Sequence, residues 1–242
     1  MAYLLKIIAH RGNKRYTPEN TMAAFFSAAT YPIDGIEFDI QFTKDEVPVV
    51  IHDERIDRTT NGRGFVSSFT YRELRQFDAG NWFDERFRGE KIPSFEEVLL
   101  WGKGKNITMH VELKQQRKEF NTFLNKCLEI IERTDMTNSV VISTFFHSYL
   151  PYIKNINPKI ETALLIKNPI LRGVQYASRF QADAIHIRNS FQAVKFYKTW
   201  TKQGLSVRAY NVNKVKEAIK CRESKLSGII VDDPKLMTET LK

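Results

Sequence analysis

The chain has 242 residues, of which 42% are hydrophobic, and this is enough for one large domain with a sizeable core. No low-complexity tract, block of like charge or internal repeat is present, which excludes a disordered, fibrous or solenoid protein. No apolar segment approaches the roughly 18 residues that a membrane span needs. We therefore expect a soluble, globular domain over residues 1–242.

The net charge of +9 belongs mainly to the C-terminal part of the chain. Residues 151–242 hold 17 Lys and Arg against 7 Asp and Glu, whereas residues 53–92 hold eight of each. Such an excess can attract an anionic substrate, lipid headgroups or nucleic acid. Because no basic run alternates with aromatic residues, scattered surface lysines are the simpler interpretation and nucleic acid is not an expected partner. Peripheral contact with a membrane stays open, and the sequence predicts no oligomeric state.

The cysteines and the first residues indicate where the protein works. Cys127 and Cys221 stand alone, without a paired or metal-binding spacing, which favours a reducing compartment. The apolar run over residues 1–9 is interrupted by Lys6 and leads directly into His10, so we interpret it as a first strand and not as a signal peptide. A cytoplasmic protein is expected.

Eight short apolar runs recur along the chain. Most of them are followed by segments with helical periodicity, such as residues 120–134, 191–204 and 212–224. Alternating strands and helices with a count of eight predict a (β/α)8 TIM barrel, in the α/β class. The predicted strands cover residues 4–10, 35–40, 107–114, 139–145, 161–166, 182–188, 205–212 and 228–233.

A ninth apolar run, over residues 47–52, follows the second barrel strand after only a few residues. A parallel crossover needs about a dozen residues or more, so we expect this run to return as an antiparallel arm. Residues 54–92 have neither strand nor helix periodicity and are rich in Arg, Gly and aromatic residues. A structureless loop of that length is unusual in a compact domain, so the sequence predicts a small inserted lobe after the second barrel strand.

The segment after the first strand carries the signals of a helix start. Thr17 suits the N-cap, Pro18 the first helical position, and Glu19 the positive end of the helix dipole. Capping alone explains these residues. An added role in a site stays open for Glu19 and Asn20.

Two predicted strands each present polar residues on one side. Residues two apart on a strand point the same way, so Glu37 and Asp39 share a face, as do His110, Glu112 and Lys114. In a TIM barrel the inward direction is common to all strands, and their carboxyl ends meet at the mouth where active sites lie. We therefore expect Glu37, Asp39 and Glu112 to converge.

Three carboxylates in one partly desolvated pocket need a strong cation, because like charges raise each other's pKa. A divalent ion would supply that charge, and all-oxygen ligands without cysteine favour Mg²⁺ or Ca²⁺ over zinc. The alternative is that the acids pair with Arg and Lys at the barrel rim.

Two histidines stand where they could serve the same mouth. His10 ends the first strand and His52 ends the antiparallel arm, while Arg11 and Lys114 would add fixed positive charge nearby. Two imidazoles beside a bound phosphate can divide the removal and delivery of a proton. The alternative is a hydrogen-bonded structural role for each histidine.

The other three histidines are weaker candidates. His110 is expected one layer deeper in the barrel, and His147 falls in a loop or at a helix start, so we expect structural roles for both. His186 could face inward together with Arg188 near the mouth, which leaves a substrate contact open.

The sequence resembles the glycerophosphodiester phosphodiesterase family in its bacterial form with an inserted lobe. The resemblance covers nearly the whole chain and rests on a series of motifs in order: "AHRG", "PENT", "GIEFDIQFTKDEVPVVIHDERIDRTTNGRG", "IPSFEEVL", "ELK", "ISTF" and "GIIVDDP". It implies a TIM barrel and one divalent cation, Mg²⁺ or Ca²⁺, held by Glu37, Asp39 and Glu112.

The resemblance also implies roles for the remaining site residues. His10 and His52 would be the acid/base pair, with Arg11 and Lys114 on the phosphate. The implied reaction hydrolyses glycerophosphocholine, glycerophosphoethanolamine, glycerophosphoglycerol or a similar diester to glycerol 3-phosphate and an alcohol. Two alternatives stay open: a phospholipase of the same barrel type acting on a lysophospholipid or phosphoinositide, and a non-catalytic barrel that binds anions or membranes.

The chain departs from the family pattern at two places. Tyr210 stands where the family often has Trp, and Val231-Asp232 replaces the "TD" before the final proline. We expect these changes to affect the wall that contacts the glycerol or the headgroup, and to leave the metal and the histidines untouched.

Overall fold

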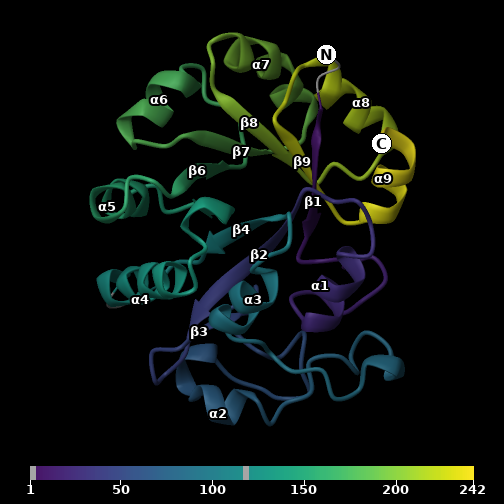
Figure 1. The fold of residues 1–242 in the computed structure, drawn as a ribbon, viewed down its shortest axis with the longest axis vertical. Helices are drawn as coiled ribbons and strands as arrows, with labels where there is room; N and C mark the ends of the chain where they lie inside the picture. The colour runs from purple at the N-terminus through teal and green to yellow at the C-terminus, as the bar shows by residue number, and fades with distance from the viewer. Residues whose placement is uncertain (1–3, 117–119) are drawn as a thin grey trace.

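All eight predicted barrel strands form in the computed structural model, which describes residues 4–116 and 120–242. They pair in parallel, and β1 bonds to both β2 and β9, which closes the sheet into a TIM barrel (Figure 1). The barrel strands are β1 (Lys6–His10), β2 (Gly35–Phe42), β4 (Thr108–Leu113), β5 (Val140–Thr144), β6 (Glu161–Ile166), β7 (Ala184–Arg188), β8 (Ser206–Tyr210) and β9 (Gly228–Val231).

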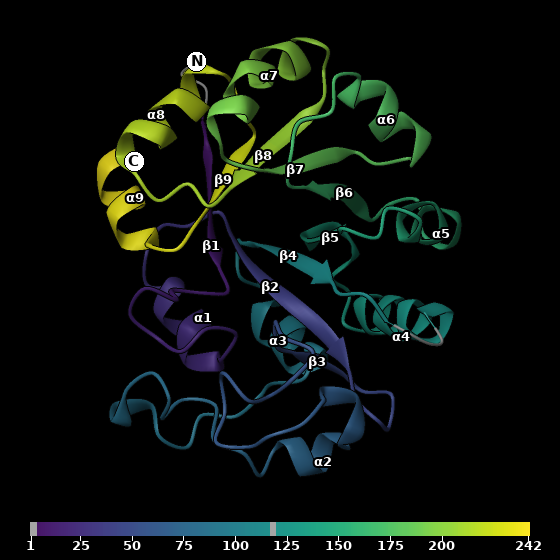
Figure 2. The same cartoon turned by 180° about the vertical axis from the view of Figure 1, so that it is seen from behind.

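A ring of helices surrounds the barrel, as the two opposite views show (Figure 1, Figure 2). Apolar residues that point outward from the strands pack against the buried faces of these helices and form the main core. Within residues 4–116 and 120–242, no helix has the length and apolar character to cross a membrane. The ring consists of α1 (Met22–Ala28), α3 (Phe95–Gly102), α4 (Phe120–Arg133), α5 (Tyr149–Ile156), α6 (Gly173–Arg179), α7 (Phe191–Lys202), α8 (Val215–Glu223) and α9 (Pro234–Leu241).

The predicted antiparallel arm is confirmed as β3 (Pro48–Val50), which pairs with the end of β2 through Ile40 and Val50. The segment that follows contains the short helix α2 (Tyr71–Leu74) and two single-turn 3₁₀ helices, η1 (Val66–Ser68) and η2 (Glu85–Phe87). A second apolar cluster, separate from the main core, supports this lobe. The boundaries 54–92 stay a prediction.

The predicted start of the first helix was wrong by four residues. Helix α1 begins after Thr21, whose hydroxyl caps the backbone of the first turn. The hydroxyl of Thr17 instead donates to the carbonyl of Asn13 at 2.7 Å. Asn20 has a φ of +58°, a left-handed conformation that no helix interior accepts, so the helix cannot start before it.

Gly12 lets the chain turn sharply after β1. Its φ is +80°, and a Cβ at this position would lie 2.6 Å from the Cβ of Ala24 in α1. The next residue, Asn13, donates its backbone N–H to the carbonyl of Ala24 at 3.0 Å. Both the backbone angle and the close approach therefore require glycine.

We predict that Gly12→Ala lowers the free energy of unfolding by about 2–4 kcal/mol, because it adds overpacking to the left-handed strain. Gly104→Ala is the matched control, since Gly104 has a φ of +78° and open space around its Cα. It should cost only the strain, about 1–2 kcal/mol. Denaturant unfolding of the two variants checks this, and equal losses would contradict the packing argument.

Candidate active site

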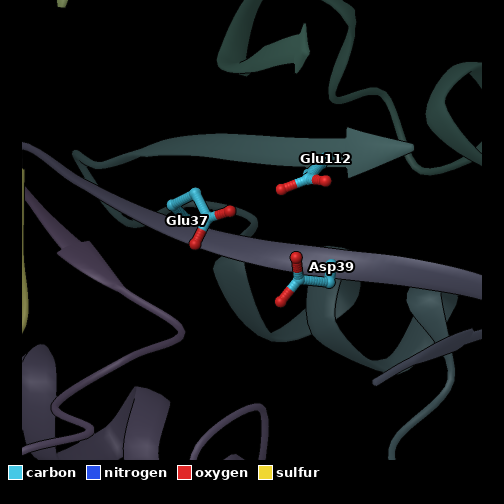
Figure 3. Close-up of side chains that lie close together, drawn as sticks. All are labelled: Glu37, Asp39 and Glu112. Atoms are coloured by element: carbon cyan, nitrogen blue, oxygen red, sulfur yellow. The ribbon is translucent and has the colours of Figure 1, made fainter. Parts of the chain in front are cut away.

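The three predicted carboxylates converge inside the barrel mouth. Glu37 and Asp39 point inward from β2, and Glu112 faces them from the neighbouring β4, where it pairs in register with Asp39 (Figure 3). One carboxylate oxygen from each lies within 4.8 Å of the other two, and all three residues are buried. Alternation along two adjacent strands is therefore sufficient to bring them together.

The pKa values in this cluster are driven apart. Burial and the charges of Asp39 and Glu112 raise the pKa of Glu37 well above its usual value. Burial and Asp39 also raise the pKa of Glu112, to about 7. Burial would raise the pKa of Asp39 too, but Lys114 and Arg11 outweigh it and hold that pKa well below its usual value.

Two cations compensate the cluster only in part. Lys114 Nζ lies 2.7 Å from Asp39 Oδ1 and 2.5 Å from Glu112 Oε1. Arg11 Nε lies 3.1 Å from Asp39 Oδ2, and its backbone N–H donates to Glu37 Oε2 at 3.2 Å. The alternative left open by the sequence, in which the acids pair with Arg and Lys, therefore occurs together with the acidic cluster. Asp39 is the acid that contacts both cationic side chains.

The residues present fit a divalent cation. Three buried carboxylates face two cationic side chains, and burial together with repulsion among the acids raises the pKa values of Glu37 and Glu112. A hard, doubly charged ion bound by oxygen ligands would stabilise all three acids in their ionised form. Glu37, Asp39 and Glu112 are the residues that could hold it.

His10 is paired with a carboxylate from the last barrel strand. Its Nδ1 donates to Asp232 Oδ1 at 2.7 Å, while its Nε2 lies 3.8 Å from Glu37 Oε2. Burial lowers the pKa of His10, although Asp232 opposes the shift. The expectation that Val231-Asp232 leaves the histidines untouched was wrong for Asp232. The contact between Asp232 and His10 could have been deduced from the predicted strands, because a closed barrel places the end of β9 beside the end of β1.

His52 has the same arrangement with a carboxylate from its own loop. Its Nδ1 donates to Asp53 Oδ1 at 2.6 Å, and burial lowers its pKa. Arg58 donates to Asp53 at 2.6 Å and to Glu19 at 2.7 Å. Glu19 in turn accepts from Arg11 at 2.8 Å. Sequence reasoning missed Asp53 and Arg58, which tie His52 to the segment that follows β1.

A cavity of about 260 Å³ opens between these groups at the mouth of the barrel. Both histidines, both cations and two of the three acids line it, while Asp39 is completely buried behind them. The predicted phosphate ligands therefore face the same space as the predicted acid/base pair. The lining residues are His10, Arg11, Glu37, His52, Glu112, Lys114, Ser143, Phe145, Leu165, Lys167, His186, Arg188, Tyr210, Asn211 and Ile230.

The secondary candidates lie near the cluster or in the cavity wall. Asn20 donates its amide to Asp39 Oδ2 at 2.9 Å, so it supports a carboxylate of the cluster. His186 lines the cavity and is completely buried, with Nε2 3.3 Å from Arg208 Nη1. Tyr210 donates its hydroxyl to the backbone carbonyl at the end of β6 at 3.2 Å. Direct roles in substrate binding stay predictions for these residues.

The remaining two histidines are placed as the sequence predicted. His110 pairs in register with Glu37, one layer deeper than Glu112, and is buried. His147 lies between β5 and α5, with Nδ1 3.0 Å from the Tyr176 hydroxyl and Nε2 2.9 Å from the carbonyl of Leu165. Neither imidazole lines the cavity.

The barrel mouth gathers acidic, basic and histidine side chains around one cavity, as in an enzyme active site, and comparison with known proteins identifies the family. The sequence model of the glycerophosphoryl diester phosphodiesterase family matches residues 10–236. The chain belongs to this family and is a phosphoric diester hydrolase.

Individual relatives match over almost their whole length. A glycerophosphodiester phosphodiesterase of Caldanaerobacter subterraneus is 34% identical over 236 residues, which cover 98% of this chain and 97% of the relative. One of Bacillus altitudinis is 34% identical, with 96% of each chain covered. A phosphodiesterase of Oleispira antarctica, solved with its product sn-glycerol-3-phosphate, superposes with a TM-score of 0.91 at 26% identity, covering 98% of this chain and 96% of the other.

We predict that the affinity of the site for Mg²⁺ or Ca²⁺ rises with pH through about 7, the pKa of Glu112. Below that pH the raised pKa values of Glu112 and Glu37 keep protons on carboxylates that an ion must displace. Each displaced proton weakens binding about tenfold per pH unit. Calorimetric titration in two buffers of different ionisation enthalpy counts these protons.

Glu112→Gln is the matched variant for this titration. It should bind either ion more weakly and release fewer protons, because it removes both a ligand and a titrating group. An affinity that does not change between about pH 6 and about pH 8, without proton release, would contradict the coupling.

Proposed function

We propose that the protein hydrolyses glycerophosphodiesters, such as glycerophosphocholine, glycerophosphoethanolamine or glycerophosphoglycerol, to glycerol 3-phosphate and an alcohol. The reaction depends on one divalent cation, Mg²⁺ or Ca²⁺. The observation that carries the proposal is the arrangement of His10 and His52, each backed by a carboxylate and both facing the cavity that holds the acidic cluster. The names of the relatives and the product in the Oleispira antarctica structure support the substrate class.

His10 and His52 are the proposed general acid and base. An ionised carboxylate only accepts hydrogen bonds, so Nδ1 of each imidazole carries the proton that Asp232 or Asp53 accepts. This leaves the lone pair of Nε2 for a substrate proton. Burial lowers both histidine pKa values, so near pH 7 the neutral ring is the more populated form and can serve as the base. The other ring must take up a proton at Nε2 before it can serve as the acid. The carboxylate then stabilises the imidazolium that forms.

The proposed chemistry has two stages. In the first, one imidazole removes the proton of the glycerol 2-hydroxyl as its oxygen bonds to phosphorus, and the other, protonated, imidazole gives a proton to the departing alcohol oxygen. In the second, water bonds to phosphorus and the bond to the 2-oxygen breaks, with the two imidazoles exchanging tasks. A neighbouring hydroxyl in the substrate supplies the nucleophile at high effective concentration.

Positive charge at the cavity serves the phosphate. Arg11 and Lys114 both line the cavity and are placed to bind phosphate oxygens. A divalent cation on Glu37, Asp39 and Glu112 would add charge stabilisation at the phosphoryl group when bound. A cation held by these acids would compete with Lys114 for Asp39 and Glu112 and with Arg11 for Asp39, while Arg11 would keep its ion pair with Glu19.

We predict that a screen of glycerophosphodiesters with Mg²⁺ or Ca²⁺ present gives glycerol 3-phosphate, and that excess chelator abolishes it. An enzymatic assay for glycerol 3-phosphate is the measurement. Lysophospholipids are the acylated controls, and faster turnover of these would move the assignment to the phospholipase. No turnover of any diester, together with tight anion binding, would indicate the non-catalytic barrel.

We predict that His10→Ala and His52→Ala each lower kcat by about 10²-fold or more, because each removes one proton-transfer group. His147→Ala is the control, since that imidazole does not line the cavity. Circular dichroism and thermal unfolding verify that each variant folds. Wild-type kcat in a folded His10 or His52 variant would refute its acid/base role.

A further inference from the structure

Two apolar side chains stand out from the surface beside the cavity. Leu171 is 83% exposed and Phe191 is 82% exposed, the highest values for large hydrophobic residues in the described part of the chain. The next, Leu4, reaches 68% and lies just before the amino end of β1, on the face opposite the mouth. Water contact on this scale is unfavourable for leucine and phenylalanine, and exposed apolar groups that gather at one place indicate an interaction site.

Both residues belong to the mouth face of the barrel. Leu171 lies in the loop that follows β6, and Phe191 is the first residue of α7, just beyond the end of β7, so both come after the carboxyl ends of neighbouring strands. Lys167 from the loop after β6 and Arg188 at the end of β7 contribute to the wall of the cavity. The exposed apolar groups are therefore at the edge of the proposed active site and not on the outer wall of the barrel.

The loops on this half of the mouth carry basic residues, Lys167, Arg172 and Lys214, and no acidic ones. The segments that follow β5, β6, β7 and β8, residues 145–148, 167–172, 189–190 and 211–214, contain no Asp or Glu. Basic side chains accompany the apolar ones: Arg172 is next to Leu171 in the chain, and Lys195 Nζ lies 4.7 Å from the ring centre of Phe191. We call Leu171, Arg172, Phe191 and Lys195 the basic apolar rim.

The acids of this region lie away from the mouth. Glu161 is at the amino end of β6, and Asp183 immediately precedes β7. Each is paired there, Glu161 with Arg208 at 2.7 Å and Asp183 with Lys154 at 2.6 Å. The positive charge of the rim is therefore not neutralised by these neighbours.

We propose that the basic apolar rim docks the protein on an anionic phospholipid bilayer. Protruding leucine and phenylalanine side chains partition into the boundary between headgroups and acyl chains, while Arg and Lys beside them bind the anionic headgroups. Nucleic acid would use the positive charge but not the apolar tips. Docking in this way turns the cavity toward the lipid surface, and it does not depend on the proposed reaction.

Vesicle sedimentation with the full chain tests the proposal. Wild-type protein should bind vesicles of phosphatidylcholine with about 30% phosphatidylglycerol, bind pure phosphatidylcholine at least about tenfold more weakly, and lose binding as salt is raised. The Leu171→Ser/Phe191→Ser double variant should bind the anionic vesicles at least about tenfold more weakly. Arg172→Gln/Lys195→Gln should do the same and flatten the dependence on salt.

A matched control separates the rim from general surface charge. Leu100 in α3 is 54% exposed. Lys105 lies in the segment between α3 and β4, and its Nζ is 5.1 Å from the centre of the Trp101 ring. This segment is on the face opposite the mouth. Leu100→Ser/Lys105→Gln should bind vesicles like wild type. Thermal unfolding and turnover of a soluble diester, if wild type has it, should be unchanged in Leu171→Ser/Phe191→Ser, because neither residue lines the cavity.

Three results would overturn the membrane assignment. The first is no binding of wild type to the anionic vesicles at low salt. The second is an equal loss in the control variant, which would show adsorption through net charge alone. The third is binding of duplex DNA, without vesicle binding, that the rim variants lose. Diester turnover is measured separately, so a failure here leaves the proposed reaction untouched, and the reverse also holds.

Discussion

Repulsion among three buried carboxylates is the constraint on which the site depends. Glu37, Asp39 and Glu112 would separate or take up protons if the chain were free to relax. They are held because each sits on a strand of a closed barrel whose alternate residues, such as Ile36 and Phe38, are completely buried against the helices. The apolar core outside the barrel thus stabilises a polar arrangement inside it that is unfavourable by itself.

The same constraint explains the other charged groups at the mouth. Arg11 and Lys114 reduce the repulsion without removing it, and Glu19 then neutralises part of Arg11. Arg58 bridges Glu19 to Asp53, the carboxylate that orients His52. Residues from the segment after β1, from the barrel interior and from the inserted lobe therefore share one ion-pair network. A change in the lobe would alter the surroundings of an imidazole and of a cation that both line the cavity.

Sequence periodicity was enough to predict the barrel and the acidic cluster, because both depend on regular geometry. The period of two along β2 and β4 decided which side chains share a face, and the short spacing before β3 excluded another parallel strand. The start of α1 was mispredicted, because the left-handed backbone of Asn20 interrupts an otherwise good capping pattern. Both Thr17 and Thr21 are suitable N-cap residues, so residue type alone could not show which of them caps α1.

The partner of His10 was missed for a different reason. Asp232 is 222 positions away along the chain, and it becomes a neighbour only because β9 pairs with β1. Its place could have been deduced by applying ring closure to the predicted strands, whereas the partner of His52 is simply the next residue. To predict contacts between residues on the first and last strands of a barrel, the order of the strands in the closed sheet is needed as well as the sequence pattern.

The position of Asp232 has a consequence for synthesis. On the ribosome, translation must continue 222 residues past His10 before the carboxylate that orients this imidazole exists. A nascent chain that ends before β9 has neither this carboxylate nor a closed barrel, so it can neither orient His10 nor hold the acidic cluster together. Enzymatic competence is thereby tied to nearly complete elongation.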